Sequence, residues 1–61
     1  MNDRYEMERE RSRRGWRVVD RFTGWPAQVN GAPQIRLSLE DADDLVDLLN
    51  LQDARRRKAE A

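Results

Sequence analysis

Residues 16–31 read WRVVDRFTGWPAQVNG, and the fold prediction starts from this segment. Between positions 16 and 22 apolar and polar residues alternate, which is typical of a β-strand with one buried face. Thr23-Gly24 then predicts a reversal, because glycine tolerates the positive φ that hairpin loops need. The alternation resumes over residues 25–29. Residues 16–29 are therefore predicted to form a β-hairpin.

A second turn follows this predicted hairpin. Asn30 and Gly31 both accept the left-handed conformation of a type I′ turn, so the pair is the strongest short turn signal in the chain. Beyond it residues 34–39 alternate again, and residues 31–38 form either a third antiparallel strand or a long loop. Pro33 cannot donate a ladder hydrogen bond, so such a strand should lie at a sheet edge or begin only after it.

An amphipathic helix is predicted next. Ser38 supplies an N-cap hydroxyl and Asp41 follows three residues later, a variant of the capping box that starts a helix near residue 39. Its apolar residues fall on one stripe, with Leu48 at the edge. The stripe consists of Ala42, Leu45, Val46 and Leu49. The opposite side carries the acids Glu40, Asp43, Asp44 and Asp47.

The end of this helix has two interpretations. In the first, Asn50 takes the left-handed position after the last turn and Leu51 packs back against it, so the helix stops near residue 50. In the second, the helix continues, Leu51 points away from the apolar stripe, and residues 52–61 form a charged extension.

The chain divides into one predicted folded module and two charged ends. Residues 1–15 carry arginine and glutamate with little apolar content, and pairs of such charges stabilise a helix by only about 0.2–0.5 kcal/mol each, so a frayed or disordered arm is predicted there. Residues 16–51 form the predicted folded module, an α+β unit of two or three antiparallel strands packed on one amphipathic helix. Residues 52–61 form a basic tail or a continuation of the helix.

The composition narrows the classes of function. The chain has 61 residues, no cysteine and no histidine, so disulfides and the usual zinc sites cannot be built. With few proton-transfer groups or nucleophiles, and with acids that follow no EF-hand spacing, we predict no enzyme, no small-molecule substrate, no cofactor and no metal site. Lacking a long apolar run, the chain should not enter a membrane, and the cytoplasm is its expected compartment.

A resemblance is carried by residues 16–24 and by the helix that ends in Leu49-Asn50. The pattern W-x-V-x-D-x-x-T-G followed by such a helix resembles small uncharacterised bacterial and phage proteins. The likeness covers roughly residues 16–50 and rests on positions that form the fold. It implies a β-hairpin-plus-helix module and no particular activity.

The small size predicts an interaction with another protein. Domains of this length without disulfides or metals commonly gain stability by association, so we predict a non-catalytic interaction module that forms a homodimer or binds a protein partner. Trp25 should be exposed beside the hairpin turn, whereas strand parity places Trp16 in the core. The predicted interface residues are Trp25, Leu48 and Leu51.

Two alternatives start from the charge pattern. A sheet backed by a helix can enter the DNA major groove, so a plasmid- or phage-type nucleic-acid-binding protein is the first alternative. Its contacts would come from Arg17, Arg21, Gln28 and Arg36 in the module and from Arg55, Arg56, Arg57 and Lys58 in the tail. The second is an inhibitor whose acidic helix face mimics a row of nucleic-acid phosphates. The charges at the two ends of the helix also have a purely structural explanation. Acids near the start of a helix and bases near its end interact favourably with the helix dipole, and this requires neither function.

Overall fold

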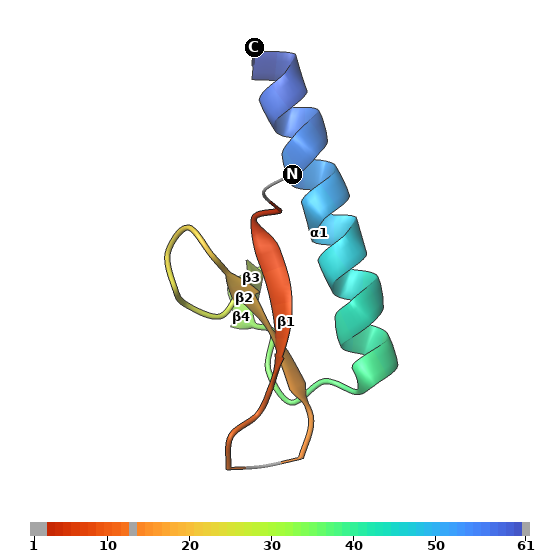
Figure 1. Ribbon diagram of the computed structural model, residues 1–61. Coiled ribbons are helices and arrows are strands. Elements are labelled where there is room, and N and C mark those ends of the chain that lie inside the picture. Colours follow the sequence, from red (N-terminus) through yellow and green to blue (C-terminus); the bar gives the residue numbers. More distant parts are fainter. Residues whose placement is uncertain (1–2, 13, 61) are drawn as a thin grey trace.

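A computed structural model describes residues 3–12 and 14–60 of the chain. It is an α+β fold, as predicted, with an antiparallel β-hairpin and a short two-stranded sheet against one long helix (Figure 1). The elements in chain order are β1 (Tyr5–Arg9), β2 (Trp16–Asp20), β3 (Gln28–Val29), β4 (Ala32–Pro33) and α1 (Leu39–Glu60).

Strand β1 corrects the prediction of a frayed or disordered arm over residues 1–15. It pairs along its whole length with β2, Tyr5 lying opposite Asp20 and Arg9 opposite Trp16. Two apolar side chains with a spacing of two, Tyr5 and Met7, pack against the core from this strand. Surrounding charges obscure that short pattern in the sequence, and the strand exists because a distant partner supplies its hydrogen bonds.

Strand β2 is hydrogen-bonded along both edges. On the side away from β1, Ala27 N–H donates to the Val18 carbonyl at 2.8 Å, and Val18 N–H donates to the Gln34 carbonyl at 3.0 Å. The predicted reversal after β2 is thus confirmed, since the chain returns beside this strand. The returning segment makes only an isolated bridge, Val19 with Pro26, and regular pairing begins later, at β3.

The turn at Asn30-Gly31 is confirmed, because both residues have positive φ, 53° and 80°, and they connect β3 to β4. Of the two alternatives for residues 31–38, a strand forms only over Ala32–Pro33, and the rest of the segment is irregular. Strand β4 ends at Pro33, and Arg36 has a φ of 57°, which interrupts the extended backbone. The backbone of Leu37 instead forms two hydrogen bonds of 2.7 Å with Trp16 at the edge of β2.

Helix α1 begins as predicted and continues to Glu60. The Ser38 hydroxyl accepts a hydrogen bond from Asp41 N–H at 3.0 Å, which satisfies one of the donors that a helix start leaves unpaired. Asn50 is in the middle of the helix rather than at its end, so the second interpretation of residues 52–61 is the correct one. The final turns extend beyond the hairpin (Figure 1).

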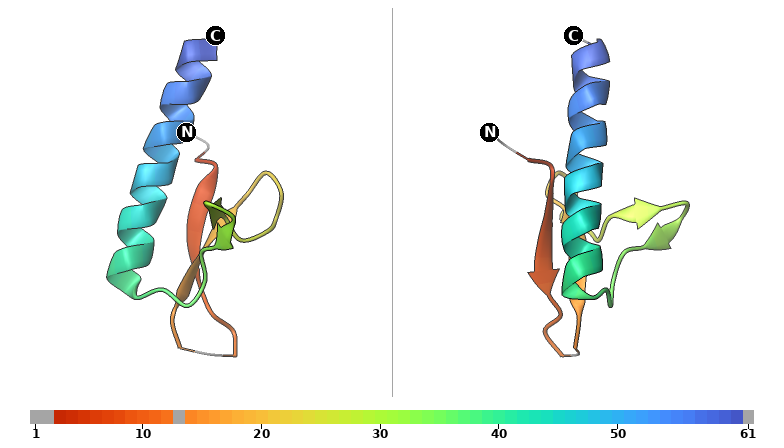
Figure 2. Two further views of the ribbon diagram at one scale, coloured as in Figure 1. Left: turned by 180° about the vertical axis from the view of Figure 1, so that it is seen from behind. Right: turned by 90° about the vertical axis from the view of Figure 1, so that its right-hand side faces the viewer.

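The core lies where α1 crosses one face of β1 and β2 (Figure 2). Val18, Ala27 and Ala42 form its buried centre, and Trp16 packs against it as strand parity predicted. The predicted stripe of the helix supplies the rest of the contact. Its partly buried members are Leu45, Val46 and Leu49. Within the described residues, α1 is too polar to qualify as a membrane-spanning helix.

Candidate interaction site

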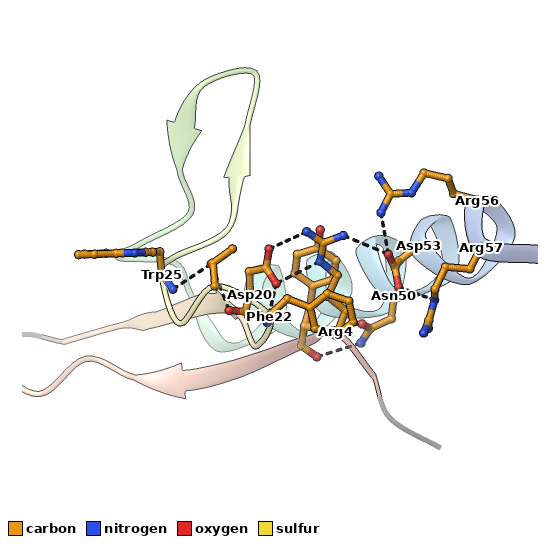
Figure 3. A network of polar contacts seen from close by, with 10 residues as sticks. Arg4, Asp20, Phe22, Trp25, Asn50, Asp53, Arg56 and Arg57 are labelled. Atoms are coloured by element: carbon orange, nitrogen blue, oxygen red, sulfur yellow. Dashed lines mark hydrogen bonds and ion pairs between the residues drawn. The ribbon is translucent and has the colours of Figure 1, made fainter. Parts of the chain in front are cut away.

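A polar network joins the start of the chain to the middle of α1. Arg4 donates two hydrogen bonds to the Asp20 carboxylate, from Nε at 3.1 Å and from Nη2 at 2.9 Å. Its third nitrogen, Nη1, donates to Oδ1 of Asp53 at 3.3 Å (Figure 3). The Phe22 and Tyr5 rings flank the guanidinium, their centroids 4.9 and 5.4 Å from its carbon. One side chain therefore connects β2 to α1.

Asp53 is the other centre of this network. Its side chain is only 3% exposed, and two further cations approach it, Arg56 Nη2 at 3.1 Å from Oδ1 and Arg57 Nε at 3.0 Å from Oδ2. Both come from the next turn of the same helix, where side chains three and four residues apart are neighbours. Three arginines thus compensate the charge of the buried carboxylate. Two of the four bases that were predicted for the tail, Arg56 and Arg57, interact with their own chain.

These contacts shift two pKa values. The hydrogen bonds from Arg4 lower the pKa of Asp20 below its ordinary value, and the backbone N–H of Phe22 adds to the effect, whereas burial opposes it. Hydrogen bonding to Asp20 likewise raises the pKa of Arg4. Both groups are therefore held in their charged forms, which suits a structural ion pair better than proton transfer.

Asn50 fixes the helix to the free edge of β1. Its amide oxygen accepts from Tyr5 N–H at 2.8 Å, and its amide nitrogen donates to the Tyr5 carbonyl at 3.0 Å. The side chain thereby acts as a neighbouring strand would, satisfying both backbone groups of one edge residue. Together with Arg4 it sets the position of α1 on the hairpin.

The face of the hairpin turned away from α1 carries balanced charge. Arg17 Nη2 lies 3.4 Å from Oε1 of Glu8, and Arg21 Nε lies 3.9 Å from Oε2 of Glu6. Both acids come from β1, which sequence reasoning did not place beside these arginines. The other predicted nucleic-acid contacts of the module, Gln28 and Arg36, are exposed on the chain after β2. Those of the tail are exposed on α1: Arg55, Arg56, Arg57 and Lys58. Because Arg17 and Arg21 each lie beside an acid, this face has little excess positive charge, which weighs against the nucleic-acid hypothesis.

The predicted interface residues are exposed, but they lie on two surfaces. Trp25 is 73% exposed on the loop between β2 and β3, and Phe22 on the same loop is 63% exposed. That loop lies across the hairpin from α1 in Figure 1 and in the left view of Figure 2. Trp25 points away from the polar network (Figure 3). Leu48 and Leu51, each 49% exposed, lie on α1 outside its buried stripe. The structure brings the two leucines together and separates them from Trp25.

Sequence reasoning did not predict the roles of three residues in these contacts, Arg4, Asn50 and Asp53. The available signal was the helical period itself, because Asp53 follows Val46 and Leu49 at the next position of the buried stripe. A polar residue at such a position indicates a partner from outside the helix. Among the residues that the structure describes, no group of acids that could hold a metal ion lies together.

Comparison of the chain with protein-family models, with curated proteins and with solved structures found no match. The resemblance carried by residues 16–24 therefore stays a prediction. The function has to be argued from the surfaces described above.

Proposed function

We propose that this chain is a non-catalytic protein-interaction module that self-associates. The observation that carries the proposal is the distribution of its apolar side chains. The buried hydrophobic residues of the described chain are three small or medium ones at the centre, with Val19 beside them, whereas several of the largest are exposed. The exposed ones are Phe22, Trp25, Ile35, Leu39, Leu48 and Leu51.

Exposed apolar area of this kind stabilises an association. A domain of about 60 residues buries only about 60% of the surface that its unfolded chain exposes, so its own core leaves little stability in reserve. Covering large apolar side chains with a partner adds about 25 cal/mol for each Å² removed from water. Large apolar side chains that stay exposed at neighbouring positions, as Leu48 and Leu51 do on α1, mark a candidate contact site.

The polar groups at the centre of the fold support a structural role. Arg4 and the two carboxylates that it joins hold the helix on the hairpin, and Ser38 caps the helix. The Thr23 hydroxyl accepts a hydrogen bond from Trp25 N–H at 3.1 Å and so shapes the loop. These groups stabilise the framework that presents the exposed apolar residues.

Sedimentation velocity tests this proposal directly. As the concentration rises from low to high micromolar, we expect the weight-average mass to rise from the 7.2 kDa of one chain towards twice that value. A short DNA duplex added in low salt should leave the sedimentation of the protein unchanged, because the hairpin arginines are paired with acids. A single 7.2 kDa species at every concentration would contradict self-association.

A further inference from the structure

One exposed stripe of α1 has the spacing of a helix-pairing seam. Its six positions are separated alternately by three and four residues, the repeat that keeps side chains facing a partner helix. All six are exposed, and they lie on the side of the helix opposite the stripe that covers the hairpin. We call these residues the seam: Asp41, Asp44, Leu48, Leu51, Arg55 and Lys58.

The chemistry of the seam changes along the helix in a symmetrical way. Two acids come first, two leucines follow, and two bases come last. Asp44 precedes Leu48 by the same four residues by which Arg55 follows Leu51, and Asp41 and Lys58 each lie three residues further out. Rotation by half a turn about the point between the leucines therefore places acids over bases.

We infer that a second copy of this chain docks on the seam, with the two α1 helices antiparallel and related by a two-fold axis between Leu48 and Leu51. This inference rests on the proposed self-association and adds its site and geometry. Leu48 of one copy contacts Leu51 of the other. Asp44 faces Arg55, and Asp41 faces Lys58, at both ends of the helix pair. Such a contact is isologous and closes at two copies.

The charged side chains of the seam are available to a partner, which supports this arrangement. In the part of the chain that the structure describes, the ion pairs of the basic tail use Arg56 and Arg57, both with Asp53. None of the ion pairs among described residues involves a seam residue. The basic tail is thus divided between a pair that faces its own chain and a pair, Arg55 and Lys58, that remains for a partner.

A parallel pair of helices is disfavoured by the same charges. It would set Asp44 against Asp44 and Arg55 against Arg55, and like charges across an interface oppose association. Exposed ion pairs add little affinity, so the leucines supply affinity and the charges select the orientation.

A groove beside the acidic half of the seam provides further room for the second copy. It has a volume of about 370 Å³, and Gln34 and Leu37 form its far wall, opposite Leu45 and Leu48 of α1. In the antiparallel arrangement the basic half of the second helix lies along this groove. Partly buried apolar side chains of the core edge, Leu37 and Leu45, would then become covered.

The test uses two charge-reversed chains. The acidic version carries Arg55→Asp and Lys58→Asp, and the basic version carries Asp41→Lys and Asp44→Arg. Each version alone should lose the dimer in sedimentation velocity, because every facing pair of seam charges becomes repulsive. An equimolar mixture should regain a dimer, because the two versions are complementary. Circular dichroism of each chain checks that α1 is retained.

A matched control places the same type of change outside the seam. Asp43→Lys also reverses an exposed acid in the first half of α1, and it should leave dimerisation unchanged. If the wild-type chain dimerises and both charge-reversed versions dimerise equally well alone, the seam is not the contact, although self-association stands. If the wild-type chain is monomeric throughout, the proposed function fails together with this inference.

Discussion

Replacing Arg4 with methionine should lower the free energy of unfolding by about 3 kcal/mol, measured by urea denaturation at a fixed protein concentration. The change keeps an apolar stem but removes the cation that Asp20 and Asp53 share. Asp53 keeps Arg56 and Arg57, whereas Asp20, with its side chain 11% exposed, keeps only its backbone contacts. The cost is therefore near the lower end of the range for breaking a buried ion pair.

The pH dependence of stability distinguishes this ion pair from simple packing. The pKa of Asp20 is lowered in the folded chain by Arg4, so this carboxylate stabilises the fold above its ordinary pKa of about 3.9. The stabilisation is lost as the pH falls through the lower, folded-state pKa. In Arg4→Met that part of the acid destabilisation should disappear.

Arg21→Met is the matched control, because its contact with Glu6 is long, at 3.9 Å, and both side chains are half exposed. It should cost less than about 1 kcal/mol. Two results would show that Arg4 contributes packing alone. One is an equal loss of unfolding free energy in the two variants, and the other is an unchanged loss of stability at low pH in Arg4→Met.

Replacing Asn50 with alanine should lower the free energy of unfolding by about 2 kcal/mol. The amide makes two hydrogen bonds to the backbone of Tyr5, and alanine leaves one donor and one acceptor at the edge of β1 without these partners. Hydrogen exchange gives the local readout, since the Tyr5 N–H should lose protection before the rest of the hairpin.

Gln52→Ala serves as the control for Asn50→Ala, because Gln52 is an exposed amide two residues further along the same helix. Its substitution should leave stability within about 0.5 kcal/mol of the wild type. Unchanged protection of the Tyr5 N–H in Asn50→Ala would mean that the Asn50 amide does not hold this edge of β1.

Local signals predicted much of this fold, and non-local pairing accounts for most of the rest. The cap at Ser38, the buried stripe of α1 and the Asn30-Gly31 turn each depend on neighbouring residues, and all three are confirmed. Strand β1 depends on a partner about ten residues away, and its two apolar residues are too few to reveal it by periodicity. The alternation after Pro33 was misleading, since Arg36 interrupts the backbone there.

The candidate site likewise combines features that local sequence predicts with features that depend on the tertiary fold. The exposure of Trp25, Leu48 and Leu51 was predictable from turn position and helix angle. The role of Arg4 was not, because it depends on two carboxylates brought from β2 and α1 by the tertiary fold. The seam itself becomes apparent only once α1 is known to continue past Leu51, since its two basic positions, Arg55 and Lys58, lie in the extension.

Disulfide cross-linking tests the antiparallel seam most directly, because the chain has no cysteine of its own. In the antiparallel pair, position 44 of one copy faces position 55 of the other, whereas identical positions lie about 16 Å apart along the helices, too far to be bridged. A heterodimer of Asp44→Cys with Arg55→Cys also loses only one of the four seam ion pairs. Under mild oxidation a mixture of the two variants should yield the covalent heterodimer, and neither variant should cross-link alone. Efficient cross-linking of Asp44→Cys with itself, or none in the mixture, would contradict the account.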